Sequence, residues 1–308
     1  MSKSEMDRLN ASFWDELCGS GLAQMLGITD RSPASLKRFD QAYLDFYPYL
    51  LGYIRPDRLT GKRVLEVGLG YGTVGQALLD SGANYFGVDI AAGPVNMIRY
   101  RQVLMNQPSS CSRASVLNLP FAAGSFDCVI SIGVFHHTGD VQRAIDETHR
   151  VLKPGGKAIL MVYNQYAYRQ WFNWPLNTLK IWLREYGFIR STKSIEVTEE
   201  QRKAYDASLD GVGAPETVFV SVRELRRMMR NFKIVRLSKE NSSPLLFLSK
   251  KWFSWPLKKL FGIQLFKKPE GGFYLLNRSW LLPTLGRWFG LDLYVEAEKK
   301  LVEISDER

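Results

Sequence analysis

Three groups of residues in this 308-residue chain have types and spacings suited to chemistry. The first is a glycine loop in the segment 64–72, VLEVGLGYG, where a strand-like run leads into glycines at alternate positions. The second is Asp89, which ends the next apolar run, and the third is the adjacent pair His136 and His137. Glycine lets a backbone approach a ligand closely, a carboxylate accepts hydrogen bonds from hydroxyl groups, and an imidazole exchanges protons near neutral pH.

The glycine loop alone is compatible with more than one class of cofactor. Gly70, Gly72 and Gly75 satisfy the GxGxxG spacing that binds a dinucleotide pyrophosphate. Asp89 follows nineteen residues after Gly70, where a carboxylate would contact a ribose in either class. The loop therefore predicts a cofactor site, and the class of cofactor depends on residues further along the chain.

The runs around these residues alternate between strand and helix. Strands are expected at 63–67, 85–89, 112–116, 126–132 and 157–163, and helices between them at 73–81, 94–105 and 140–152. Strands separated by ten to fifteen helical residues indicate βαβ units, a parallel sheet and right-handed crossovers. Ligands of such sheets bind at the carboxyl ends of the strands, where the glycine loop, Asp89 and the histidines are expected.

The regions on either side of this core are expected to complete the fold. Ser35 is the expected cap of an N-terminal helix, and Pro48 is expected to kink that helix or to start a new one. Ser221 and Glu224 have the spacing of a capping box for a later helix. Two further strands are expected at 233–239 and 291–298. The chain is therefore divided into a helical cap (1–60), a cofactor-binding core (61–164), a helical or lid insertion (165–232) and C-terminal strands with a basic aromatic insertion (233–308).

With these motifs in order, the segment 63–163 resembles the class I S-adenosylmethionine-dependent methyltransferases, particularly the small-molecule group that contains quinone-biosynthesis enzymes. Residues 66–72 are similar to the first motif of that family, 118–121 and 125–127 to its segment across the fourth strand, and 150–156 to the turn before its fifth strand. The resemblance implies a Rossmann-like α/β fold, a mainly parallel seven-stranded sheet with helices on both faces, and S-adenosyl-L-methionine as the cofactor.

The resemblance also implies roles for residues of this chain. The implied cofactor-binding residues are Glu66, Gly68, Gly70 and Tyr71 at the glycine loop, Asp89 at the ribose, Ile90, Ser115 and Val116 at the adenine, and Ile132 and Gly133 beside the sulfonium. The family often has an acid on the adenine amino group at the position of Ser115. In this chain the backbone or a hydroxyl is expected to replace that contact.

His136 and His137 follow the fourth strand, and an imidazole there can take a proton from a hydroxyl or amine acceptor as the methyl group moves. Alternatively, they only stabilise the turn. Holding donor and acceptor in line lowers a bimolecular barrier by about 7–11 kcal/mol, which exceeds the roughly 10²–10⁴-fold effect of a general base. Alignment is therefore the larger expected contribution. The acceptor pocket is expected outside the central sheet, and its candidate residues are Tyr43, Tyr47, Tyr163 and Asn164.

The formal net charge of +10 is unevenly distributed. Residues 1–164 carry 16 basic and 15 acidic side chains, whereas 165–308 carry 25 and 16. The segment 250–287 holds eight basic residues and one acid among Trp and Phe side chains. This mixture is compatible with a solvated face, with peripheral contact to an anionic membrane, or with nucleic acid. Lysine pairs beside bulky apolar groups suit lipid better, so nucleic acid is the less expected partner.

The remaining sequence features place the protein in the cytoplasm, with or without attachment to a membrane surface. No run approaches the length of a membrane span, and the N-terminus has no signal-like apolar stretch. Three scattered cysteines predict neither a disulfide framework nor a metal site.

The sequence thus predicts an enzyme that transfers a methyl group to a small or lipid-like acceptor, at oxygen, nitrogen or carbon. The alternatives are a nicotinamide-dependent oxidoreductase that uses the same glycine loop, an RNA-modifying methyltransferase, and a non-catalytic cofactor-binding protein. The chain lacks an Asn-Pro-Pro-Tyr-type motif after the fourth strand, which counts against methylation of base amines.

Overall fold

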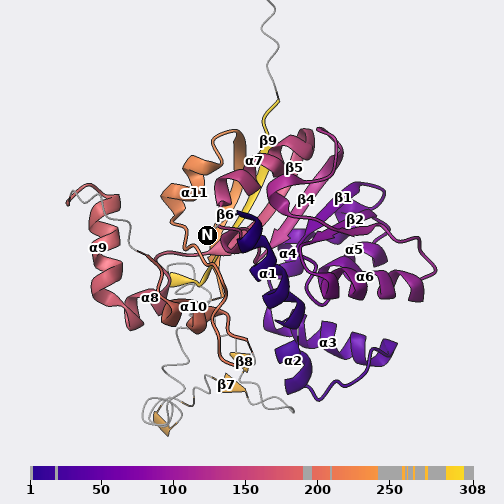
Figure 1. Cartoon of the computed structure of the whole chain (residues 1–308), viewed down its shortest axis with the longest axis horizontal. Coiled ribbons are helices and arrows are strands. Elements are labelled where there is room, and N and C mark those ends of the chain that lie inside the picture. The colour runs from indigo at the N-terminus through magenta and orange to yellow at the C-terminus, as the bar shows by residue number, and fades with distance from the viewer. Residues whose placement is uncertain are drawn as a thin grey trace, which may run out of the picture.

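The computed structural model describes residues 3–17, 20–189, 196–208, 210–241, 259–260, 262, 266–267, 275–276 and 289–301. These residues fold into a central sheet with helices on both sides (Figure 1). Most of the basic segment 250–287 lies outside the described residues, so its expected contact with a membrane or nucleic acid stays a prediction. In the described part of the chain, no helix is both long and apolar enough to cross a membrane.

Seven strands form the sheet in the order β3-β2-β1-β4-β5-β9-β6. They are β1 (Arg63–Val67), β2 (Asn84–Asp89), β3 (Cys111–Arg113), β4 (Phe126–Ile132), β5 (Leu152–Tyr163), β6 (Phe232–Glu240) and β9 (Asp292–Lys299). Neighbours from β3 to β5 pair in parallel, whereas β9 runs antiparallel to both β5 and β6. The predicted mainly parallel seven-stranded sheet is confirmed.

Two strands have an end that lies three or more residues from the sequence prediction, whereas the other strand ends agree within one residue. The strand expected at 112–116 ends at Arg113, because a 3₁₀ turn follows in which the Ser115 hydroxyl accepts a hydrogen bond from the Leu117 N–H at 3.4 Å. The fifth strand was expected to begin at residue 157. It begins at Leu152, which already pairs with Phe126 across an irregularity in the register.

Helices cover the two faces of the sheet with separate apolar cores (Figure 1). One face packs against α4 (Leu50–Ile54), α5 (Thr73–Asp80) and α6 (Ala92–Leu104), and the other against α7 (Val141–Val151) and α11 (Val222–Met228). The neighbours Val64 and Leu65 on β1 belong to opposite cores, because successive strand side chains alternate between faces. Burial on both faces explains why this strand reads as a continuous apolar run.

The N-terminal region supplies α1 (Lys3–Leu17), α2 (Ser20–Met25) and α3 (Pro33–Phe46). The prediction that Ser35 caps α3 is wrong. Ser32 is the cap, and its hydroxyl accepts a hydrogen bond from the Ser35 N–H at 3.3 Å. Pro33 then occupies the first helical turn, where its missing N–H costs nothing. As expected, Pro48 lies at a helix boundary, between α3 and α4.

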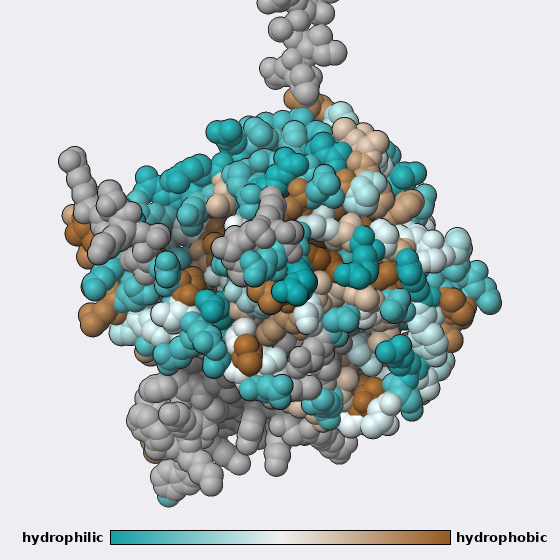
Figure 2. Space-filling view, viewed as in Figure 1, coloured by the Kyte–Doolittle hydropathy of each residue, from teal (hydrophilic) through white to brown (hydrophobic). Residues whose placement is uncertain are grey.

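The insertion after β5 contains α8 (Tyr168–Asn173), α9 (Pro175–Glu185) and α10 (Glu199–Tyr205) and leads to α11. The capping box of α11 is confirmed, since the Ser221 hydroxyl accepts from the Glu224 N–H at 3.0 Å and the Glu224 carboxylate accepts from the Ser221 N–H at 3.4 Å. Apolar side chains are exposed around α9, among them Phe172, Leu176 and Phe188, and brown surface is visible there at the left of Figure 2.

Beyond β6, β7 (Phe266–Lys267) and β8 (Leu275–Leu276) pair as a short antiparallel ladder that is separate from the main sheet. The strands β6 and β9, from the last quarter of the chain, complete that sheet. The division of the chain into four segments at 60, 164 and 232 stays a prediction.

Candidate functional site

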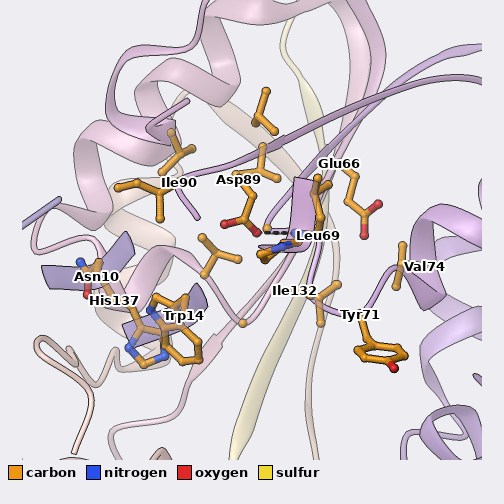
Figure 3. Close-up of a pocket in the computed structure, with 18 of the residues that line it drawn as sticks. Asn10, Trp14, Glu66, Leu69, Tyr71, Val74, Asp89, Ile90, Ile132 and His137 are labelled. Atoms are coloured by element: carbon orange, nitrogen blue, oxygen red, sulfur yellow. Dashed lines mark hydrogen bonds between the residues drawn. The ribbon is translucent and has the colours of Figure 1, made fainter. Parts of the chain in front are cut away.

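A pocket lies at the carboxyl ends of β1, β2 and β4, and its further walls come from α1 and α3 (Figure 3). All ten residues predicted to bind the cofactor line this one pocket: Glu66, Gly68, Gly70, Tyr71, Asp89, Ile90, Ser115, Val116, Ile132 and Gly133. The sheet order explains this convergence, because neighbouring parallel strands end at the same edge. The individual roles of these residues stay predictions.

The glycine loop forms the floor of the pocket in a conformation that L side chains disfavour. Gly68 has a φ of 84°, and a Cβ there would overlap the side chain of Val134. Gly70 has a φ of 50°, but a Cβ there would meet no atom within 4 Å. The first glycine thus permits close packing of the chain against itself, and the second leaves open space where a ligand can approach the backbone.

Asp89 connects this loop to the start of α6. Its Oδ2 accepts a hydrogen bond from the Leu69 N–H at 2.8 Å (dashed in Figure 3), and its Oδ1 accepts one from the Ala91 N–H at 2.9 Å. Burial raises the pKa of Asp89, and these backbone hydrogen bonds partly oppose that rise. Because each carboxylate oxygen can accept a second hydrogen bond, the group is held in place and still has capacity for a ligand.

Glu66 lies deeper on β1 and is 3% exposed. Its Oε2 accepts a hydrogen bond from the Tyr85 hydroxyl at 2.6 Å. Burial raises the pKa of Glu66 to about 8, although the Tyr85 hydrogen bond opposes this. The carboxyl group is therefore largely protonated at pH 7 in the absence of a bound cation.

The nearby cation Arg101 is already paired. Its guanidinium donates to both carboxylate oxygens of Asp40 at 2.8 and 2.9 Å, and its Nε donates to the carbonyl oxygen of Tyr71 at 3.1 Å. Arg101 thus ties α6 to α3 and to the glycine loop from outside the pocket. Among the described residues, the pocket lining includes three acids, Asp7, Glu66 and Asp89, and no lysine or arginine.

Helix α1 closes one side of the pocket. The Asn10 Nδ2 donates to the carbonyl oxygen of His137 at 2.7 Å, and the Trp14 ring lies 4.7 Å from the His137 ring. Figure 3 shows these three residues side by side. The Asp15 carboxylate also accepts a hydrogen bond from the Gly93 N–H at the start of α6. Sequence reasoning missed Asn10 and Trp14, because their only signal is membership of an N-terminal helix without a motif.

The two histidines lie in different environments. His137 lines the pocket, and its Nδ1 is 2.8 Å from the carbonyl oxygen of Glu216. His136 is fully buried behind it, with its ring 4.1 Å from the His137 ring and 3.9 Å from the Tyr163 ring. Burial lowers the pKa of both imidazoles. Of the predicted catalytic pair, only His137 faces the pocket, because the tight 3₁₀ turn after β4 points His136 into the interior.

The four predicted acceptor residues also separate. Tyr43 lines the pocket, whereas Tyr47 packs behind it with its ring 4.9 Å away. Tyr163 is not part of the lining either, and its hydroxyl donates to Asp206 at 2.9 Å. Asn164 is buried with its Nδ2 donating to the Gly290 carbonyl oxygen at 2.8 Å. Its amide is thus used in a hydrogen bond to the backbone. Contrary to the prediction, Asn164 does not line the pocket.

The cysteines of the core do not resemble reactive or ligating thiols. Cys111 and Cys128 are both buried and outside disulfides. Burial raises the pKa of each thiol to about 12, which keeps both protonated and unreactive. Within the described residues, no group of three or more His, Cys, Asp or Glu side chains is arranged to hold a metal ion.

Comparison with known proteins adds an independent line of evidence. A family model described as a methyltransferase domain matches residues 65–160. A ubiquinone biosynthesis O-methyltransferase of Pseudomonas aeruginosa is 31% identical over 111 residues, which cover 35% of this chain and 47% of that protein. The corresponding protein of Nitrosococcus oceani is 31% identical over 123 residues, covering 39% of this chain and 52% of that one. The match thus spans about half the length of these relatives.

One solved structure shows that the likeness of fold extends well beyond the family match. A putative sarcosine dimethylglycine methyltransferase from Galdieria sulphuraria superposes with a TM-score of 0.53 at 14% identity, over 92% of this chain and 98% of that one. At this identity the likeness concerns the fold alone. The match at 65–160 confirms the predicted resemblance of this segment to the S-adenosylmethionine-dependent methyltransferases, and the structural likeness extends the shared fold beyond it.

Proposed function

We propose that this chain transfers a methyl group from S-adenosyl-L-methionine to a hydroxyl oxygen of a small acceptor. The observation that carries the choice of cofactor is the acidic lining of the pocket, with Asp7, Glu66 and Asp89 and, in the described residues, no lysine or arginine. S-adenosylmethionine has a cationic sulfonium and an ammonium group, whereas a nicotinamide dinucleotide brings an anionic pyrophosphate. An acidic, partly buried pocket attracts the former and repels the latter.

The lining residues fit the cofactor. Asp89 would accept hydrogen bonds from the ribose hydroxyls, because its carboxylate is oriented by two backbone N–H groups and retains free acceptor capacity. Glu66 would offset the charge of the amino group, and the open space over Gly70 would admit the methionine part. The Ser115 hydroxyl lies in the lining where the family often has an acid. When bound, the cofactor supplies an electrophilic methyl group on sulfur.

Oxygen as the acceptor atom is supported by the relatives and by His137. The P. aeruginosa and N. oceani proteins are named as O-methyltransferases, at about 30% identity over a third of this chain. A hydroxyl group must lose its proton as it is methylated, and an imidazole is suited to accept that proton near neutral pH. His137 is the imidazole that lines the pocket, although its Nδ1 lies 2.8 Å from the Glu216 carbonyl oxygen and its Nε2 is buried and faces Asp206.

The cofactor assignment is tested by isothermal titration calorimetry of the purified chain with S-adenosylmethionine and, separately, with NAD⁺. We expect binding of the former, its loss in Asp89→Asn, and unchanged binding in Asp80→Asn, which alters an exposed acid at the end of α5. Binding of NAD⁺ without binding of S-adenosylmethionine would refute the proposal and favour the oxidoreductase.

The acceptor class is tested by incubating the chain with methyl-labelled cofactor and an extract from its host. We expect the label in small hydroxylated molecules, bound through an ether linkage. Label in the RNA fraction would instead favour the RNA-modifying alternative, and label in lipid would connect the acceptor with the basic segment 250–287.

A further inference from the structure

Helix α9 exposes an apolar face at the edge of the molecule, away from the sheet (Figure 1). Leu176, Leu179 and Tyr186 are exposed and follow one another at spacings of three and seven residues, which places them on one side of a helix. Phe172 in the preceding α8 and Phe188 just beyond α9 are exposed as well. Leu176 is 75% exposed and Phe188 67%. The apolar surface thus extends along α9 and past both of its ends.

The inner side of α9 attaches the helix to the protein through few groups. Thr178 is the one buried residue of this fully described helix, and its hydroxyl donates to the carbonyl oxygen of Gln170 at 2.9 Å. The Glu185 carboxylate accepts hydrogen bonds from the hydroxyls of Tyr166 and Ser221. A helix of 11 residues is marginal in water unless it buries an apolar face. A partner that covers the outward face would therefore stabilise α9.

Basic side chains border the apolar face of α9. Lys180 follows Leu176 by one helical turn, and Arg184 follows Lys180 by another, so both lie beside that face. Lys180 is exposed. The segment 172–189 contains one acid, Glu185, and the hydrogen bonds described above turn its carboxylate inward. The outer surface of α9 therefore combines apolar groups with positive charge, and its acid lies on the inside.

The neighbouring helix α11 extends the positive surface. Its exposed side carries four arginines at spacings that place them on one helical face: Arg223, Arg226 and Arg227 in the helix and Arg230 just beyond it. The two surfaces meet where the Arg223 Nη1 donates to the Glu185 carbonyl oxygen at 2.7 Å. The Arg223 guanidinium also lies 5.7 Å from the centre of the Tyr186 ring. Figure 2 shows both at its left side, hydrophilic over α11 and hydrophobic around α9.

The composition of this joined surface matches a lipid bilayer better than a second copy of the chain or a nucleic acid. A second copy would bring like charges together, which repel. A nucleic acid would neutralise the arginines, but aliphatic side chains such as Leu176 and Leu179 do not stack on bases as aromatic rings do. A bilayer with anionic lipids suits both parts, because its phosphates attract arginine and lysine and its acyl chains cover apolar side chains.

We infer that the outward faces of α9 and α11 bind the surface of a membrane that contains anionic lipids. The apolar side chains of α9 enter the boundary between headgroups and acyl chains, and the arginines of α11 stay at the level of the phosphates. None of the residues of this surface lines the pocket, so the inference is independent of the proposed methyl transfer. It is also separate from the membrane contact predicted for the segment 250–287.

The test is flotation of the purified chain with vesicles of phosphatidylcholine, either alone or mixed with phosphatidylglycerol. We expect the wild type to bind only the mixed vesicles, and less strongly as the salt concentration rises. Arg226→Gln should lower the partition coefficient about fivefold, which is equivalent to about 1 kcal/mol for one basic residue near an anionic surface. Leu176→Glu should lower it about tenfold or more, because the leucine side chain no longer enters the bilayer.

Matched substitutions elsewhere on the molecule serve as controls. Val103→Glu on α6 and Arg58→Gln between α4 and β1 change exposed side chains of the same kinds outside this surface. Both variants should bind the mixed vesicles as the wild type does. Leu176→Glu should unfold at the same temperature as the wild type, because the side chain that it replaces is exposed.

Absence of wild-type binding to the mixed vesicles would overturn the inference. Binding that neither Leu176→Glu nor Arg226→Gln weakens would do so too, because the vesicles would then contact another part of the chain, such as 250–287. Dimerisation in solution that Leu176→Glu abolishes would assign the face to a second copy instead. RNA binding that is lost in Arg226→Gln and kept in Leu176→Glu would assign it to nucleic acid. None of these measurements depends on cofactor binding, so failure of the proposed function would appear separately.

Discussion

The protonation of Glu66 makes the stability of the unloaded protein depend on pH in an unusual direction. The carboxyl group has a pKa of about 8 in the folded protein, against 4.5 when exposed, because it is buried on β1. The native state therefore holds this proton more tightly than the unfolded chain, and the contribution of Glu66 to stability falls as pH rises from 4.5 to about 8. At pH 7 this costs the native state about 3 kcal/mol.

The substitution Glu66→Gln isolates this effect, because glutamine has the same shape, carries no charge and can still accept the hydrogen bond from Tyr85. The variant should match the wild type in stability near pH 4.5 and exceed it by about 3 kcal/mol at pH 7. A gain of about 3 kcal/mol corresponds to a rise in Tm of at least about 5 °C. The assay is thermal or urea unfolding of both proteins between pH 4.5 and 8.5.

Cofactor binding should respond in the opposite way. A bound cation favours ionised Glu66, so the wild type should release a proton on binding S-adenosylmethionine near pH 7, and its affinity should rise toward pH 8. Glu66→Gln should bind more weakly and without that pH dependence. A stability difference between the two proteins that is the same at pH 4.5 and pH 8 would refute the reasoning, because it would show that Glu66 has the same pKa in the folded and unfolded states.

Two further predictions concern the glycine loop and the ion pair behind it. Gly68→Ala should lower the free energy of unfolding, measured with urea, by more than Gly70→Ala does, because only a Cβ at Gly68 overlaps Val134. Gly70→Ala should mainly weaken cofactor binding, because its Cβ fills the open space. Arg101→Met should cost about 3 kcal/mol, because it leaves the largely buried Asp40 without its charged partner and with only the hydrogen bond from the Thr73 hydroxyl. Adding Asp40→Asn should recover part of that loss, and equal stability of the single and double variants would contradict the pairing.

The parts of the fold and site that the sequence revealed are those encoded over short distances. Residues 63–67 and 126–132 were identified as strands to the residue, because burial on both faces makes each a short apolar run. The ten residues predicted to bind the cofactor lie at strand ends or in the loops that follow them, so locating the strands located them. His137 was found for the same reason, one turn beyond β4.

The residues that the sequence did not reveal owe their positions to tertiary contacts. Asn10 reaches His137 across 127 positions of the chain, and Asp206 reaches it from an insertion without a motif. Nothing local distinguishes His136 from His137 either, since they are adjacent and only the direction of a 3₁₀ turn separates them. Sequence patterns report periodicity and local hydrogen bonding, and neither records which distant side chain an element meets.

The chain as a whole has a positive net charge, whereas the pocket is lined by acids. The two charges are compatible, because salt screens charges that lie far from the pocket. Two charges in water at physiological salt are screened over about 8 Å, so the +10 of the whole chain has little influence inside a pocket lined by Asp7, Glu66 and Asp89. Burial strengthens the interactions of those three acids with a cation that enters. In the proposed reaction, transfer of the methyl group would remove the sulfonium charge, and the attraction that holds the cofactor would weaken with it. The same acids would thus favour binding of the methyl donor and release of the demethylated product.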